Sequence, residues 1–425
     1  MPTPSSYDTI VIGAGPAGSS ASALLAERGL RVLVLEREKF PRYHIGESLL
    51  PFTCFPLKRL GLLEKMRQSA FVKKYSVQFI SQSGKASQPF YFSTRYEPEV
   101  AQTWQVLRSE FDQILLENAR AKGATVLEET TVLELIQQDG RTLGVKAKSK
   151  SGEVTEYRAP MTLDCSGREA FVPTRLNWRI REPKLNKVAV WTYYRGAKRD
   201  AGIEEGATTV AYVPDKGWFW YIPQHRDMIS VGVVAEGKYL TRDGVRDPKD
   251  IFNREIEQNQ WIKDHLACGT QVGSHYLTSE YSFRSRYCAS DGLLLAGDSF
   301  GFLDPVFSSG VMLALKSGTM AADAIHAAYD AQDFSAERFV EYGRVLREGL
   351  ENMRKLVYAF YDPNFSFRKL TNKYPEMTGP ITDCLSGDVN KDFSKLYEAV
   401  AETAEVPEPL PYGAPFLRTA ETECA

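Results

Sequence analysis

No stretch of about 18 consecutive apolar residues occurs in the sequence, so no membrane-spanning helix is expected. The N-terminus lacks the basic segment followed by an apolar one that marks a secretory signal. Lys and Arg number 52 against 54 Asp and Glu, a net charge of −2, which leaves no basic excess for binding nucleic acid. These absences predict a soluble cytoplasmic protein that has no membrane span and does not bind nucleic acid.

Cysteine and histidine are sparse. The six cysteines (positions 54, 165, 268, 288, 384 and 424) show no Cys-x-x-Cys spacing and no disulfide framework, which favours a reducing compartment. The five histidines (positions 44, 225, 265, 275 and 326) include no pair at metal-ligand spacing. The sequence therefore predicts neither structural disulfides nor a metal site.

Glycine, by contrast, forms a recognisable motif near the N-terminus. An apolar run, Thr9 to Ile12, ends in a Gly13-Ala-Gly15-Pro-Ala-Gly18 turn, a small-residue helix follows, and a second apolar run ends at Glu36. This is the context that a dinucleotide-binding βαβ unit requires, with an acidic residue about 20 residues after the glycines to accept from ribose hydroxyls. The alternative, an ordinary βαβ unit with a glycine turn, is the weaker interpretation.

Three further segments resemble motifs of the flavin monooxygenase superfamily. Residues 104–123 form an amphipathic helical pattern opening with Arg108, 292–318 read as strand, Gly-Asp turn and small-residue helix, and 40–48 (FPRYHIGES) resemble the loop that passes the flavin. The resemblance implies FAD as cofactor, with Arg108 neutralising phosphate and Asp298 bonding the ribityl or pyrophosphate region. The FAD-binding residues implied in this way are Gly13, Gly15, Ala17, Gly18, Glu36, Arg37, Glu47, Ser48, Arg108, Asp298, Pro305 and Gly310.

The middle of the chain alternates like β-strands, at 75–92, 187–195, 208–213, 217–223 and 228–235. The 425 residues exceed one average domain, and we expect an α/β fold: a Rossmann-like FAD-binding domain interleaved with a β-sheet substrate domain and a C-terminal helical segment. The predicted FAD-binding domain comprises 1–74, 104–186 and 281–345. The substrate domain comprises 75–103 and 187–280, and the helical region with a proline-rich tail comprises 346–425.

The stretch GWFWYIP, residues 217–223, is unusually rich in aromatic residues. A strand here places Trp218 and Trp220 on one face and Phe219 and Tyr221 on the other. Core packing would account for a single tryptophan. The Trp-x-Trp-x-Ile-Pro pattern, however, resembles the signature of flavin-dependent halogenases, in which this segment stands between flavin and substrate. The resemblance implies a wall that only a small oxidant passes.

A second motif agrees with this resemblance. Phe302, Pro305, Ser308 and Gly310 match the Phe-x-x-Pro-x-x-Ser-x-Gly pattern of the halogenases. The segment reads as a loop that opens a helix, whose N–H groups attract anions. We therefore expect chloride or bromide at Ser309 and Gly310, with Ser308 beside it. A contact of this turn with the flavin alone is the alternative.

The resemblance also implies a catalytic lysine, which falls on Lys74 in the segment AFVKKY. Most Lys-Lys pairs are solvated, and in a strand Lys73 and Lys74 face opposite sides, so only one can serve. An amine there would bind hypohalous acid or form a haloamine. The choice between Lys73 and Lys74 stays open at this point.

One residue departs from the tryptophan halogenases: Phe307 stands where they carry Glu. This favours the branch that acts on phenols and pyrroles, whose rings are already electron-rich. We expect an enzyme of natural product biosynthesis that uses FADH2 from a separate flavin reductase to halogenate a small aromatic substrate, free or tethered to a carrier protein. An FAD-dependent monooxygenase, a geranylgeranyl-reductase-like oxidoreductase and a non-catalytic flavin-binding protein are the alternatives.

Overall fold

The computed structural model describes residues 5–182, 184–279 and 281–417. Its N-terminal βαβ unit forms where the sequence predicts it: β2 (Thr9–Ile12) and β3 (Val32–Leu35) are parallel, fully buried and joined by α1 (Pro16–Glu27). They lie at the centre of a six-stranded sheet in the order β20-β21-β12-β2-β3-β8. The remaining strands are β8 (Thr125–Leu127), β12 (Met161–Asp164), β20 (Ala289–Ser290) and β21 (Leu293–Leu295).

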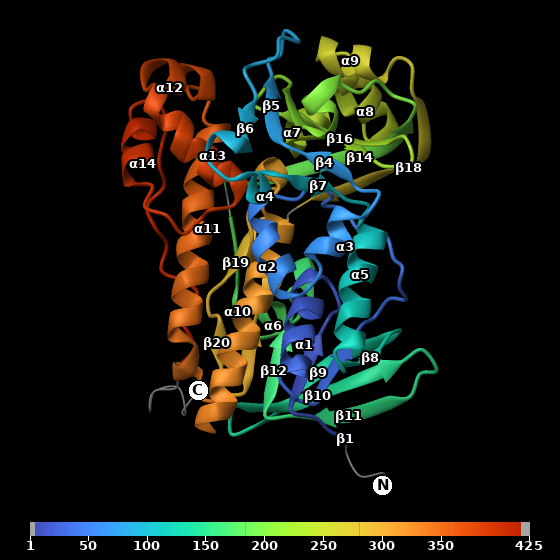
Figure 1. The fold of residues 1–425 in the computed structure, drawn as a ribbon, viewed down its shortest axis with the longest axis vertical. Helices are drawn as coiled ribbons and strands as arrows, with labels where there is room; N and C mark the ends of the chain where they lie inside the picture. The colour runs from blue at the N-terminus through green and yellow to red at the C-terminus, as the bar shows by residue number, and fades with distance from the viewer. Residues whose placement is uncertain (1–4, 183, 280, 418–425) are drawn as a thin grey trace.

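Three helices run along this sheet. Figure 1 shows α1 between α5 (Arg108–Ala121) and α10 (Gly310–Ala331). Small residues allow the close approach: a Cβ at Gly318 of α10 would lie 2.3 Å from the Ala17 carbonyl oxygen of α1. A second, four-stranded sheet has the order β1-β11-β10-β9. Its strands are β1 (Ser5–Ser6), β9 (Thr130–Gln138), β10 (Arg141–Ser149) and β11 (Val154–Arg158).

A seven-stranded sheet occupies the other end of the molecule (Figure 1), in the order β18-β14-β17-β16-β15-β5-β6. The predicted strands of the middle region are confirmed, and 75–92 form a hairpin with a long loop. The strands are β5 (Ser76–Ile80), β6 (Phe90–Tyr91), β14 (Lys187–Arg195), β15 (Thr208–Tyr212), β16 (Trp218–Gln224), β17 (Met228–Glu236) and β18 (Thr270–Ser279). The domain boundaries given above stay a prediction.

Short elements connect the two ends. A two-stranded sheet pairs β4 (Val72–Lys74) with β7 (Thr103–Gln105), and a three-stranded sheet has the order β13-β19-β22. The helix expected within 104–123 begins at Arg108. Trp104 and Gln105, at the start of that range, belong to strand β7. The three-stranded sheet contains β13 (Arg179–Arg181), β19 (Phe283–Ser285) and β22 (Gly301–Phe302). Helices α7 (Gly237–Leu240), α8 (Pro248–Ile256) and α9 (Gln260–Leu266) contribute to the core on one face of the seven-stranded sheet.

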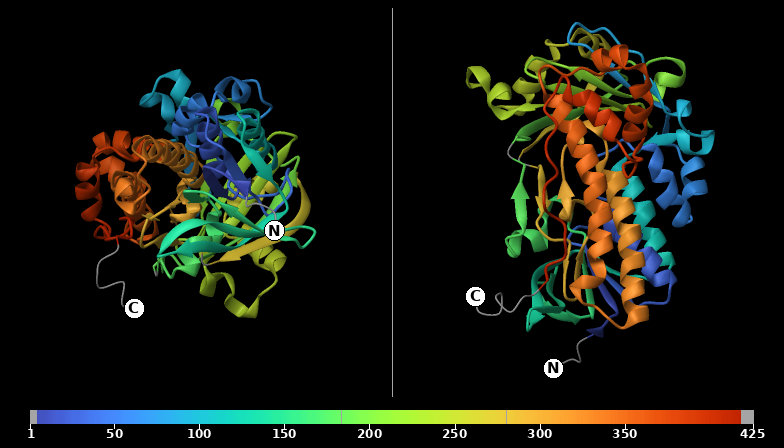
Figure 2. Two further views of the ribbon diagram at one scale, coloured as in Figure 1. Left: turned by 90° about the horizontal axis from the view of Figure 1, so that it is seen from below. Right: turned by 90° about the vertical axis from the view of Figure 1, so that its left-hand side faces the viewer.

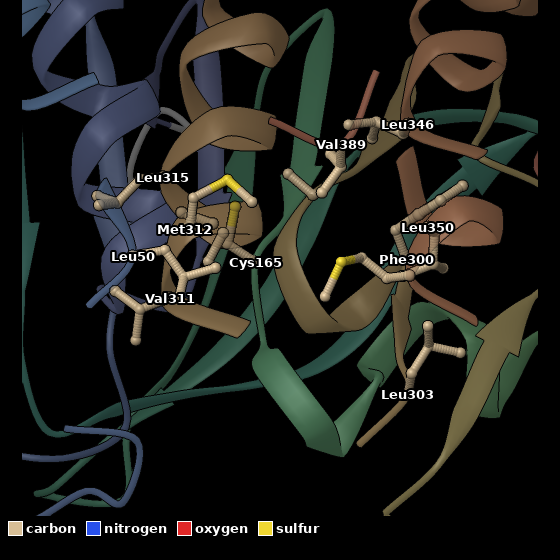
Figure 3. Packing of buried hydrophobic residues seen from close by; sticks show 14 of the residues in the cluster. Leu50, Cys165, Phe300, Leu303, Val311, Met312, Leu315, Leu346, Leu350 and Val389 are labelled. Atoms are coloured by element: carbon tan, nitrogen blue, oxygen red, sulfur yellow. The ribbon is translucent and has the colours of Figure 1, made fainter. Parts of the chain in front are cut away.

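The C-terminal region is helical, as predicted. α11 (Val340–Tyr361) runs alongside α10 over most of the molecule's length (Figure 2), and α12 (Phe367–Lys373), α13 (Thr378–Ser386) and α14 (Ser394–Ala401) follow. Figure 3 shows α10 burying Met312 and Leu315 near Leu50, while α11 buries Leu346 and Leu350 near Phe300 and Val389. This packing joins the described part of the C-terminal region to the main hydrophobic core.

Between Ser5 and Leu417 no helix is long and apolar enough to cross a membrane. No cluster of His, Cys, Asp and Glu suited to a metal occurs in the described ranges. Five cysteines are free thiols, four of them buried, and Cys424 lies outside the described residues.

Candidate active site

An open cavity of about 1830 Å³, counting its mouth, lies between the six-stranded and the seven-stranded sheets. Of the residues predicted to bind the cofactor or halide or to act in catalysis, Gly18, Lys74 and Ser309 do not line it. Those that do are Gly13, Gly15, Ala17, Glu36, Arg37, Glu47, Ser48, Arg108, Trp218, Trp220, Asp298, Pro305, Ser308 and Gly310.

The three glycines of the N-terminal turn serve different purposes. Gly13 has φ +95°, and a Cβ there would lie 2.6 Å from the Cys165 carbonyl oxygen. A Cβ at Gly18 would lie 2.0 Å from the Gly13 carbonyl oxygen. Beside Gly15, in contrast, the nearest atom to a built Cβ is Arg42 Nη2 at 3.7 Å. Gly13 and Gly18 permit tight packing, whereas Gly15 leaves open space over the first turn of α1.

Glu36 is held in place at the end of β3. Its carboxylate accepts a hydrogen bond from the Ala14 N–H and one from the Glu38 N–H, each at 2.8 Å. Each oxygen keeps a lone pair for a ligand hydroxyl. The neighbouring Arg37 pairs with Glu169 at the cavity rim.

Arg108 lines the cavity, and its phosphate contact stays a prediction. Its guanidinium is buried and bonds Asp112 with two parallel contacts of 2.8 and 2.9 Å, and it donates to the Ile45 and Gly46 carbonyls. Arg42, which is not among the predicted site residues, lines the cavity beside Gly15 and pairs with Asp112 at 3.2 Å. Arg42 is therefore the cation closest to the glycine turn, while Arg108 fixes the 45–48 loop.

These features fit FAD. The empty space over Gly15, the helix N-terminus below it and Arg42 beside it suit a pyrophosphate, and Glu36 suits a ribose. Asp298 lines the same cavity, and its burial raises its pKa to about 6. The fit to FAD rests on the open space beside Gly15, which a side chain at that position would fill.

Lys74 is fully buried, whereas its neighbour Lys73 is exposed, so the two side chains alternate as expected. The ammonium of Lys74 donates to Ser48 Oγ at 2.8 Å and to the Leu49 carbonyl at 3.1 Å. Ser48 Oγ in turn lies 2.7 Å from Thr208 Oγ1. Burial lowers the pKa of Lys74 to about 7. Ser48 and Thr208 both line the cavity, so a hydroxyl pair lies between the amine and the cavity.

The alternation expected in β16 is confirmed. Trp218 and Trp220, with ring centroids 6.2 Å apart, both line the cavity, and Phe219 and Tyr221 pack in a separate core under α8 and α9. Trp220 Nε1 donates to Ser230 Oγ at 3.1 Å. The two indoles therefore form one wall of the cavity.

Trp218 is fixed by a contact from the C-terminal region. Its Nε1 donates to the Tyr361 hydroxyl at 2.9 Å, and that hydroxyl donates to Asp304 Oδ2 at 3.0 Å. Burial raises the pKa of Asp304 to about 7. Neither Tyr361 nor Asp304 is among the predicted site residues, because Tyr361 lies 143 positions from Trp218 in the sequence.

Further aromatic side chains lie near the cavity wall formed by Trp218 and Trp220. Phe307 contacts Phe360 and Phe367 at centroid distances of 5.8 and 6.2 Å, and Lys74 Nζ lies 5.6 Å from the Phe92 ring centroid. Phe307 thus belongs to an apolar cluster with α11 and α12, and its side chain offers no charge to a substrate.

The Ser308–Gly310 turn opens α10. Ser308 adopts a left-handed conformation with φ +56°, and Ser309 is the N-cap residue without a side-chain capping bond. The first N–H groups of a helix have no intrahelical acceptor. Ser308 and Gly310 line the cavity while Ser309 is buried.

Comparison with known proteins agrees with this geometry. The profile of the "FAD binding domain" family matches residues 6–336. The chain is 30% identical over 430 residues to a 1H-pyrrole-2-carbonyl-[peptidyl-carrier protein] chlorinase of Pseudomonas fluorescens, covering 95% of both chains. It is 34% identical over 386 residues to the corresponding brominase of Pseudoalteromonas luteoviolacea, covering 90% of this chain and 92% of the relative.

Solved structures give the same result. The flavin-dependent brominase Bmp2 superposes with a TM-score of 0.85 at 28% identity, covering 94% of this chain and 98% of that one. The myxobacterial chondrochloren halogenase CndH superposes with a TM-score of 0.80 at 30% identity, covering 94% and 96%. The expected fold class and the FAD cofactor are confirmed, and the monooxygenase and reductase alternatives are not favoured.

Proposed function

The chain belongs to the flavin-dependent halogenases, and from this premise we propose that it halogenates a pyrrole- or phenol-like ring through Lys74. It is an oxidoreductase that uses FAD with chloride or bromide. When bound and reduced, FAD supplies the activation of O2 that oxidises halide to hypohalous acid. The residues of the chain hold the reactants, orient them and keep water out.

The observation that carries the proposal is the buried position of Lys74. With a pKa near 7, a large fraction of this amine is neutral at physiological pH and can form a haloamine, while the ammonium form can hydrogen-bond hypohalous acid. Its contacts with Ser48 Oγ and the Leu49 carbonyl point the amine toward the hydroxyl pair at the cavity wall. Trp218 and Trp220 keep a bulky ring away from the flavin side.

Few polar groups near Lys74 could activate an aromatic substrate ring toward halogenation. Phe307 lies in an apolar cluster, and no carboxylate bonds Lys74 within the described residues. A ring that is already electron-rich needs no such help, which supports a pyrrole or a phenol. We propose halide binding at Ser308, Ser309 and Gly310, where the start of α10 offers N–H groups and a partial positive charge.

The pyrrole halogenases named above are matched over nearly their whole length. This supports a pyrrole-2-carbonyl substrate on a carrier protein. We further propose that a separate flavin reductase supplies FADH2 and that the reaction takes place in the reducing cytoplasm.

Purified protein, FAD, a reductase, NADH and bromide would be incubated with pyrrole-2-carbonyl carrier protein, free pyrrole-2-carboxylate or a panel of phenols. Mass spectrometry would detect the bromine isotope pair in the product. Bromination of the carrier-bound pyrrole alone supports the full proposal, and bromination of free phenols alone refutes carrier tethering.

The role of Lys74 is tested by measuring oxygen uptake and brominated product together. Lys74→Ala should keep oxygen uptake and lose product by about 10²–10⁴-fold, and Lys73→Ala is the matched control. If Lys74→Ala brominates like wild type, the proposed delivery through this lysine is wrong.

A further inference from the structure

A line of hydrogen-bonded side chains runs from the molecular surface to the flavin cavity. Tyr43 is 46% exposed, and its hydroxyl lies 3.0 Å from the Tyr193 hydroxyl. Tyr193 donates to Glu47 Oε1 at 2.7 Å. Glu47 lines the cavity and is only 2% exposed. Three side chains therefore form an unbroken hydrogen-bonded line from a partly exposed tyrosine to the cavity.

The direction of the hydrogen bonds is fixed. An indole N–H can only donate, and Trp191 Nε1 donates to the Tyr43 oxygen at 2.7 Å. Tyr193 uses its single proton toward Glu47, so the bond between the two tyrosines must be donated by Tyr43. Both phenol protons then point inward, toward Glu47.

The surroundings of Glu47 favour the protonated form of its carboxyl group. Its Oε2 is buried and accepts no hydrogen bond of good geometry, although Ser230 and Gln224 lie beside it. Burial raises the pKa of Glu47 above its ordinary value, since it outweighs the charge of Arg108 and the nearby donors.

The other titratable groups around Glu47 do not compete for this proton. The charge of Arg108 is compensated by Asp112, and burial lowers the pKa of His44 to about 3, so that ring stays neutral. Burial raises the pKa of Tyr43 to about 12 and that of Tyr193 further, so both phenols stay protonated.

We propose that Tyr43, Tyr193 and Glu47 form a proton path that supplies the flavin cavity from solvent. This rests on the halogenase function, whose overall reaction converts reduced FAD, O2, halide and one proton into oxidised FAD, hypohalous acid and water. The Glu47 O–H bond breaks and its proton enters the cavity. At the same time Tyr193 protonates Glu47, Tyr43 reprotonates Tyr193, and a proton from solvent water reprotonates Tyr43. The shifts are concerted, because neither phenolate is stable here.

The test compares Glu47→Gln and Tyr193→Phe with Tyr276→Phe. Tyr276 is the matched control, because its ring stacks on Tyr43 and Trp191 at 5.0 and 5.4 Å while its hydroxyl is outside the path. In single-turnover bromination Glu47→Gln should slow product formation by on the order of 10²-fold. Tyr193→Phe should slow it and move the alkaline limit to higher pH, since it removes a donor that lowers the pKa of Glu47. Tyr276→Phe should behave like wild type.

A second measurement uses the FAD-free protein and no turnover. In the wild-type minus Glu47→Gln difference spectrum, in which the bands of Asp298 and Asp304 cancel, one protonated-carboxyl band should persist above the ordinary glutamate pKa of about 4.3, and in Tyr193→Phe this band should titrate at higher pH. Rates and pH limits equal to those of Tyr276→Phe in both path variants would overturn the proposal, as would a band that disappears near the ordinary pKa. Wild-type protein that takes up oxygen without bromination would refute the proposed function instead, and the infrared titration would still decide the state of Glu47.

Discussion

Replacing Lys74 with methionine should stabilise the folded protein at acidic pH and not at alkaline pH. Methionine has a similar length and no charge, so it fills the same space. The pKa of Lys74 falls from 10.5 to about 7 on folding because the side chain is fully buried. At 1.36 kcal/mol per pH unit this depression corresponds to about 5 kcal/mol, an upper value for the penalty of a buried ammonium.

The sign follows from proton binding in the two states. Below about pH 7 both states carry the proton, so the folded state bears the full penalty. Between about pH 7 and 10.5 only the unfolded chain holds it, and the penalty shrinks by about 1.4 kcal/mol per pH unit. The variant also loses two hydrogen bonds, to Ser48 and Leu49, which contribute about 1 kcal/mol each.

Lys74→Met should therefore be about 3 kcal/mol more stable than wild type near pH 6 and about equal to it near pH 9. Urea unfolding of both proteins at the two pH values measures the difference, and Lys73→Met, at the exposed neighbouring position, is the control. A stability difference that is the same at both pH values would show that Lys74 does not change its charge on folding, and the reasoning would fail.

Three further predictions concern the cavity. Gly15→Val should fill the space above the first turn of α1 and abolish FAD binding in a protein that still folds, as judged by flavin absorbance and circular dichroism; a yellow, fully loaded variant would contradict the pyrophosphate assignment. Bromide should give an anomalous diffraction peak at Ser308–Gly310 in crystals with FAD, and its absence at saturating bromide would leave only a flavin contact for this turn. Tyr361→Phe should remove the acceptor of the Trp218 N–H, costing about 1–3 kcal/mol for the buried donor and raising the peroxide released per bromination; an unchanged ratio would show that Trp218 needs no anchor.

The sequence by itself determined the parts that depend on neighbouring residues. Gly18 is required because a Cβ there would meet the carbonyl oxygen of Gly13 in the same turn, and the apolar runs around this turn become the buried strands β2 and β3. The alternation of Trp218 and Trp220 with Phe219 and Tyr221 follows from the two-residue period of a strand. In the same way, adjacency dictates that Lys73 and Lys74 face opposite sides, whereas the tertiary structure decides that Lys74 is the buried one.

Only the tertiary structure decided which distant side chains meet. Ser48 and Thr208 lie 160 positions apart, and Glu47 and Tyr193 lie 146 apart, yet they bond because the 45–48 loop is placed against the seven-stranded sheet. Likewise, Arg108 bonds Asp112 and the Ile45 carbonyl, and Arg42 lies beside the glycine turn. Such contacts carry no local pattern, because a hydrogen bond between two distant residues imposes no periodicity on the sequence around either one.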